Sequence, residues 1–131
     1  MLERKYVEEL FQNLKTNSNE FFKKVSENVH WIVMGTHPLA GEYFTKENFA
    51  NHTFIRLGKL LKEGNALLEI KRIFIDKNYA IIEMKGISTA LNGKPFDNSY
   101  CWIVKFENEI ITEVTAYVDS ALVQQLINEN E

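Results

Sequence analysis

One carboxyl group of this sequence is placed where it could do acid–base chemistry. Side chains alternate along a strand, so Glu113 shares a face of the segment 110–118 with Ile111, Thr115 and Tyr117. A carboxyl group among such neighbours is partly desolvated, and desolvation raises its pKa toward the range useful for a general acid or base. The alternative is a glutamate on a solvent-facing strand, paired with a lysine.

Three further polar residues have both a chemical and a structural interpretation. His37 precedes Pro38 in a turn-rich segment, where it is either an acid or base near neutral pH or a plain loop histidine. Asp119 either caps a terminal helix or forms hydrogen bonds at the mouth of a pocket. Tyr117 either donates a hydrogen bond to a ligand carbonyl or is a core aromatic residue.

The sequence has no pattern typical of a metal or cofactor site. Its three histidines share no metal-ligand spacing, and there is no His-Glu-x-x-His motif or carboxylate-rich loop. The lone Cys101 excludes an internal disulfide and a multi-cysteine metal site. No glycine-rich phosphate loop or serine elbow is present. We therefore expect no metal and no cofactor.

Composition limits the class of protein. The 131 residues carry 15 Lys and Arg against 18 Asp and Glu, for a net charge of -3, and 45% of them are hydrophobic. This predicts one folded domain over 1–131 and disfavours nucleic-acid binding, which usually needs a basic face. No apolar run approaches the roughly 18 residues of a spanning helix, and the first residues lack an apolar signal-peptide centre. We expect no membrane association and a cytoplasmic location.

Apolar periodicity changes between the two halves of the chain. The first half predicts two helices before residue 25, a strand near 29–34 and a helix that Thr45 caps and that continues past Leu61. The second half predicts strands over 66–75, 79–91, 96–106 and 110–118, with a hairpin at Asn92-Gly93, and then a short terminal helix. Helices that precede an antiparallel meander indicate an α+β domain whose long strands twist and curl around the helices.

That order of elements carries four loose motifs. They are Trp31-x-x-x-Gly35-x-x-Pro38-x-x-Gly41, Asn92-Gly93, Asn98-x-Tyr100, and Ile110 followed by Tyr117-x-Asp119. Together they resemble the SnoaL-like branch of the nuclear transport factor 2-like superfamily, which includes ketosteroid isomerases and polyketide cyclases. The resemblance covers essentially the whole chain. It implies a cone-shaped, cystatin-like α+β barrel with a pocket between the curled sheet and the N-terminal helices, and a homodimer packed through the outer sheet face.

The resemblance also implies which strand faces line the pocket. It places the face of Trp102 inward, together with the face of Glu113, and it leaves Ile110, Thr112, Val114, Ala116 and Val118 facing outward toward a dimer partner. The expected pocket walls are aromatic: Trp31, Tyr43, Tyr100, Trp102 and Tyr117. Asn98, Asp119, Glu113 and His37 are the expected polar contacts, with Glu113 and His37 as the catalytic candidates.

The chain departs from the superfamily's best-known chemistry. In ketosteroid isomerases a carboxylate removes a proton beside a carbonyl, while a Tyr and a protonated Asp stabilise the enolate. The matching positions fall near 32–34, Phe11 and Trp102, which are apolar. This implies that the chain is not an isomerase of the usual mechanism.

Three functional hypotheses remain. The first is a pocket protein for a small apolar carbonyl or hydroxyl compound, acting as a cofactor-free isomerase, cyclase or dehydratase with Glu113 as base. The second is a non-catalytic, dimeric ligand-binding module. The third is a protein-interaction domain, for which nothing in the sequence marks a peptide groove.

Overall fold

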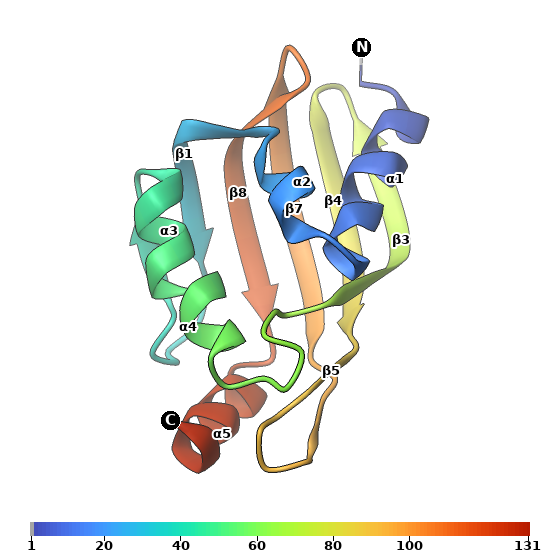
Figure 1. Ribbon diagram of the computed structural model, residues 1–131. Coiled ribbons are helices and arrows are strands. Elements are labelled where there is room, and N and C mark those ends of the chain that lie inside the picture. The colour runs from blue at the N-terminus through green and yellow to red at the C-terminus, as the bar shows by residue number, and fades with distance from the viewer. Residues whose placement is uncertain (1) are drawn as a thin grey trace.

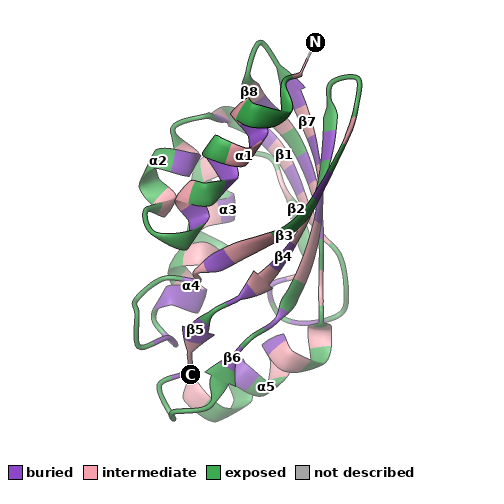
Figure 2. Cartoon of the chain, turned by 90° about the vertical axis from the view of Figure 1, so that its right-hand side faces the viewer, coloured by how far each residue is buried: buried purple, intermediate pink, exposed green. Residues whose placement is uncertain are grey.

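A six-stranded curved sheet forms one layer of the molecule, and helices cover one of its faces (Figures 1 and 2). The computed structural model describes residues 2–131. The strand order is β2-β1-β8-β7-β4-β3, in which β1 and β8 are parallel and every other pair is antiparallel. The strands are β1 (Val25–Val33), β2 (Gly41–Tyr43), β3 (Leu68–Asp76), β4 (Tyr79–Gly86), β7 (Ser99–Glu107) and β8 (Ile110–Val118). A separate two-stranded sheet pairs β5 (Ser88–Thr89) with β6 (Pro95–Phe96). The α+β prediction is confirmed.

The helices are short and gain their stability from packing rather than from length. They are α1 (Arg4–Gln12), the 3₁₀ turn η1 (Asn13–Lys15), α2 (Ser18–Phe22), α3 (Lys46–His52), α4 (Phe54–Gly58) and α5 (Ser120–Asn130). Two of the caps are as expected: the Thr45 side chain accepts the Asn48 N–H, and the Asp119 side chain accepts the Ala121 N–H. No helix among residues 2–131 is long and apolar enough to cross a membrane.

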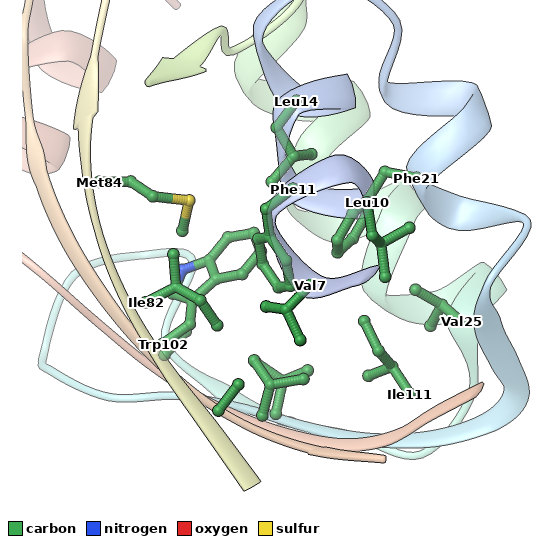
Figure 3. Close-up of a cluster of buried hydrophobic side chains, with 14 of the residues drawn as sticks. Val7, Leu10, Phe11, Leu14, Phe21, Val25, Ile82, Met84, Trp102 and Ile111 are labelled. Carbon is green, nitrogen blue, oxygen red and sulfur yellow. The ribbon is translucent and has the colours of Figure 1, made fainter. Parts of the chain in front are cut away.

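The core lies between the helices and the concave face of the sheet. In Figure 3, Phe11 and Phe21 point from the helices toward Trp102 and Ile82 of the sheet. The rings of Phe11 and Trp102 meet edge to face, with centroids 6.1 Å apart. These four side chains are buried, and their apolar contact holds the helical layer against the sheet.

The predicted single helix from Thr45 to Leu61 is instead two short helices. The chain leaves helical geometry at Thr53, whose φ is -122° and ψ -77°. The hydroxyl of Thr53 donates a 2.6 Å hydrogen bond to the Phe49 carbonyl, and its backbone N–H donates to the same oxygen. The hydroxyl thus shares the carbonyl that accepts the last helical N–H of α3, and α4 begins after the non-helical Thr53, at Phe54.

The facing predicted for β8 is wrong because a β-bulge interrupts this strand. Phe106 of β7 pairs with Ile111, but the neighbouring Lys105 pairs with Glu113, so Thr112 is an extra residue. An extra residue reverses the alternation beyond it. Ile111 therefore faces the core as expected, but so do Val114 and Ala116, which are buried. Glu113 and Tyr117 lie on the outer face.

The outer face of the sheet has no helix of residues 2–131 over it (Figure 2). One row of paired residues crosses five strands there, and most of its members are apolar: Ile32, Thr115, Ile103, Ile81 and Phe74. The adjacent row is polar and contains the Lys105–Glu113 ion pair, whose charged atoms are 3.6 Å apart. The outer face thus has an apolar stripe, although not the one expected from β8.

Candidate functional site

A small cavity of about 50 Å³ lies between the concave face of the sheet and α3, α4 and α5. Aromatic and aliphatic side chains make up nearly all of its wall. The lining residues are Trp31, Val33, His37, Leu39, Phe49, Thr53, Phe54, Leu57, Tyr100, Trp102, Ala116, Val118 and Val123. Four of them, namely Trp31, His37, Tyr100 and Trp102, are predicted site residues, and the structure brings these together.

Trp31 supplies an unused hydrogen-bond donor beside the cavity. Its side chain is fully buried, its ring stacks on Phe49 with centroids 3.7 Å apart, and it meets Trp102 edge to face at 5.2 Å. The indole nitrogen has no acceptor among residues 2–131. A buried unpaired donor costs about 1–3 kcal/mol. The cavity wall itself exposes only apolar surface, so a ligand oxygen reaches this N–H only when a side chain of the wall moves.

Tyr100 and Trp102 come from the same strand face, as predicted. They alternate with outward-facing residues of β7, and both line the cavity. Burial raises the pKa of Tyr100 above its usual range, because an ionised phenol would lose its hydration. Tyr100 therefore stays protonated at neutral pH and keeps its hydroxyl as a donor.

His37 lies at the cavity wall in its neutral form. Its Nδ1 accepts the Leu39 N–H at 3.2 Å, so its Nε2, which is 3.2 Å from the Met34 carbonyl oxygen, carries the proton and donates. Burial lowers the pKa of His37, since desolvation disfavours the charged ring. The loop reaches this shape through Gly35, which has a φ of +119° and leaves no space for a Cβ beside Ser120.

Three predicted ligand contacts have structural roles away from the cavity. Asn98 is fully buried, and its amide binds backbone atoms: Oδ1 accepts the N–H groups of Ser99 and Asp119, and Nδ2 donates to the Asp119 carbonyl. Asp119 caps α5. The Tyr43 hydroxyl donates to the Leu39 carbonyl at 2.8 Å. None of these three lines the cavity.

Glu113 and Tyr117 are corrections to the expected site. The side chain of Glu113 is 49% exposed and lies 3.6 Å from Lys105 Nζ, which is the alternative interpretation given above. Tyr117 is 44% exposed on the same outer face. The bulge at Thr112 turns both side chains away from the cavity, so Glu113 is not in a position to act as its base.

The helical wall of the cavity was not predicted from the sequence. Phe49, Phe54 and Leu57 come from α3 and α4, and Thr53 lies between the two helices. The apolar face of the predicted helix was the one signal in the sequence for this wall. The break at Thr53, after which Phe54 lies near Trp102 of the sheet, has no such signal. Among residues 2–131, no group of three or more His, Cys, Asp or Glu side chains could hold a metal ion.

Comparison with curated proteins finds two distant relatives and no matching family model. The dimerizing cyclase phiC of a fungal species is 26% identical over 129 residues, and the dimerizing cyclase tstC of Talaromyces stipitatus is 23% identical over 124. The alignments cover 96% and 92% of this chain but 57% and 55% of the relatives. The chain thus spans little more than half the length of either relative.

Comparison with solved structures finds close geometric matches at low identity. An NTF2-like protein from Burkholderia thailandensis superposes with a TM-score of 0.77 at 17% identity, over 94% of this chain and 95% of that one. TerC, co-crystallised with polyporic acid, gives 0.72 at 14% identity, over 95% and 96%. A hypothetical protein with a ketosteroid isomerase-like fold from Catenulispora acidiphila, in complex with trimethylamine, gives 0.67 at 14%, over 88% and 86%. This chain therefore has the nuclear transport factor 2-like fold that its sequence motifs resemble.

Proposed function

We propose that this protein binds a small, largely apolar compound bearing a carbonyl or hydroxyl oxygen in the cavity between sheet and helices. The observation that carries the proposal is an apolar cavity lined by the fully buried Trp31, whose indole N–H has no partner among residues 2–131. Sites for small molecules combine apolar walls with a few placed polar groups in this way. Tyr100, held protonated, supplies a second donor to the ligand.

We further propose that the bound compound is a substrate, in a cyclisation or isomerisation that begins with removal of a proton beside its carbonyl. The similarity to two cyclases supports this reaction class. Neutral donors such as Trp31 and Tyr100 stabilise negative charge that develops on an oxygen within an apolar site. His37 is the proton acceptor in this proposal, because it lines the cavity as the neutral base.

One observation favours the alternative of a non-catalytic binding module. Both ring nitrogens of His37 are engaged by backbone groups, so Nδ1 must release the Leu39 N–H before it can take a proton. A binding module would use the same Trp31 and Tyr100 donors without that change. The two functions therefore share a ligand and differ in turnover.

Binding is tested with two probes that differ in one oxygen. Acetylnaphthalene and ethylnaphthalene are titrated while the fluorescence of Trp31 and Trp102, the protein's two tryptophans, is followed. One hydrogen bond is worth about 1 kcal/mol, so the ketone should bind roughly fivefold more tightly, and Trp31→Phe should remove the difference. Equal affinity of the two probes, or no binding of either, would contradict the proposal.

Catalysis is tested without knowledge of the natural substrate. The methyl protons of acetylnaphthalene exchange for deuterium when a base removes them, and NMR follows this exchange. The His37→Gln variant keeps an acceptor for the Leu39 N–H and a donor for the Met34 carbonyl, but it has no basic nitrogen. We expect protein-dependent exchange that this variant abolishes while still binding the probe. Binding without exchange in the unchanged protein would establish the binding module instead.

We also propose that two copies of the chain pair through the outer sheet face. The apolar row from Ile32 to Phe74 crosses five strands on a face that no helix of residues 2–131 covers. Phe74, Ile81 and Tyr117 are among the large side chains exposed on this face. An apolar patch of this kind marks an interaction site on most soluble proteins.

A further inference from the structure

A second hollow lies on the other side of the cavity wall. This groove of about 640 Å³ runs between α2, α3, α4 and the turn at residues 64–65. Its apolar part is formed by Phe22, Ala50, Phe54 and Ile55. Polar and charged side chains surround that part: Ser18, Asn19, Glu27, Lys46, Glu47, Asn51, Lys59 and Asn65.

Phe54 separates the groove from the cavity. It is the one residue of 2–131 that lines both. Its ring meets Phe22 edge to face, with centroids 5.1 Å apart, on the groove side. It lies 5.8 Å from the ring of Phe49 and 6.5 Å from Trp102, which both line the cavity. Displacement of this single side chain would join the two spaces.

The position of Phe54 in the chain allows such a displacement. Phe54 is the first residue of α4 and directly follows the non-helical Thr53. Its side chain is half-buried and apolar, so moving it breaks no side-chain hydrogen bond. Thr53, in contrast, is buried and tied to the Phe49 carbonyl, which holds the backbone in place while the ring moves.

The volumes of the cavity and the groove show why a ligand needs both spaces. A cavity of about 50 Å³ holds a few water molecules, whereas ligand sites usually measure about 300–1,000 Å³. The groove lies within that range even without the cavity. An oxygen that bonds to Trp31 must therefore belong to a molecule whose remaining part lies outside the cavity.

We propose that Phe54 is a gate, and that the ligand lies across it with its oxygen-bearing end at Trp31 and an apolar chain in the groove. This inference rests on the proposed function, since it assumes a ligand in the cavity. It narrows the substrate class to elongated compounds. The groove favours an uncharged chain, because the two lysines and two glutamates that line it have no net charge. One of these lysines, Lys46, also forms an ion pair with Glu27 at 3.1 Å.

The gate is tested by the rate of probe binding. If the open state has a population of about 10% or less, Phe54→Ala should raise the association rate constant of acetylnaphthalene about tenfold or more. Phe54→Leu should give an intermediate increase, and it serves if the alanine variant does not fold. Ile87→Ala is the matched control, because Ile87 is an exposed apolar residue that lines neither the groove nor the cavity. Its association rate should equal that of the unchanged protein.

The groove is tested by chain length. 2-Acetyl-6-hexylnaphthalene, which carries its ketone at one end and its chain at the other, should bind more tightly than acetylnaphthalene, by up to about fourfold for each methylene group that the groove buries. Ala50→Phe fills the groove without touching the cavity wall. It should remove the advantage of the longer chain, and it should lower the affinity for the hexyl ketone more than that for acetylnaphthalene.

The outcomes separate this inference from the proposed function. If the unchanged protein binds neither ketone, the proposed function fails. If acetylnaphthalene binds but neither Phe54 variant accelerates its association, the gate is refuted while the cavity site stands. If the hexyl chain gives no gain in affinity, or if Ala50→Phe leaves the gain intact, the chain does not lie in the groove and this part of the inference is overturned.

Discussion

At the scale of single residues, the cavity has neutral donors and a neutral base in place of a carboxylate. Trp31 and Tyr100 are uncharged donors, and burial favours the neutral form of His37. An apolar cavity stabilises such groups better than charged ones, since desolvation penalises charge. The site is therefore suited to polarising an oxygen of a neutral ligand.

The buried His37 should make stability depend on pH. Its pKa in the folded protein is lower than in the unfolded chain, so the unfolded chain binds the proton first as pH falls. The contribution of His37 is fully present above about pH 6.5 and is lost as the pH falls toward the folded pKa. Urea unfolding between pH 7 and pH 5 should show a smaller loss of stability for His37→Gln than for the unchanged protein. Identical losses would refute this account.

Asn98 should matter for stability and not for ligand affinity. Asn98→Ala leaves the buried N–H and carbonyl groups of Asp119 without their partners. We expect a loss of about 3 kcal/mol in the free energy of unfolding, measured by urea titration. Asn51→Ala, at an exposed position of α3, is the matched control and should change stability by less than about 0.5 kcal/mol. A loss of probe affinity in folded Asn98→Ala would instead restore Asn98 as a ligand contact.

Three of the four predicted site residues that line the cavity share one property. Trp31, Tyr100 and Trp102 lie in regular strand segments, where alternation determines the facing once a single residue is oriented. Asn98 and Tyr43 lie away from the cavity for another reason: their side chains bind backbone atoms of Asp119 and Leu39, and no local pattern reveals such partners. Burial of a polar side chain is thus predictable from the sequence, but its partner is not.

At the scale of elements, two irregularities decide the site. The break at Thr53 divides the predicted long helix and places Phe54, and the bulge at Thr112 reverses the facing of β8. The order of elements was predictable because apolar period and turn residues report it directly. The bulge was not, because one extra residue in a strand leaves both faces with plausible apolar residues.

Deletions within β8 test the role of the bulge. Without Thr112, the strand alternates regularly from Ile111 and still turns Val114 and Ala116 inward. The Thr112 hydroxyl is buried and has no partner among residues 2–131, so its removal leaves no new unpaired group. Deletion of Val114 instead gives a regular strand only with Glu113 turned into the core, where its charge has no partner. We expect the first variant to unfold cooperatively on heating, as followed by circular dichroism, and the second to show no folded state. The opposite ranking would contradict the bulge assignment.

At the scale of the whole molecule, one face of the sheet packs on the helices and contributes to the cavity, while the other carries an apolar row in the open (Figure 2). The fold and the existence of an apolar outer stripe could be predicted from the sequence, because strand count and alternation require them. The members of the stripe could not, since they depend on the register across five strands.

Variants of two isoleucines can distinguish a specific dimer interface from association through surface hydrophobicity in general. Ile81 is 36% exposed within the apolar row, and Ile87 is 40% exposed outside it, between β4 and β5. If two copies pair through the row, Ile81→Glu buries two unpaired charges at the interface, and sedimentation should show a monomer where the unchanged protein is a dimer. Ile87→Glu adds the same charge at a similar exposure and should leave the dimer intact. A dimer that survives Ile81→Glu, or an unchanged protein that sediments as a monomer, would show that this row is not the interface. The cavity lies on the opposite side of the sheet, so monomeric Ile81→Glu should still bind the naphthyl ketone, which makes ligand binding a property of one chain.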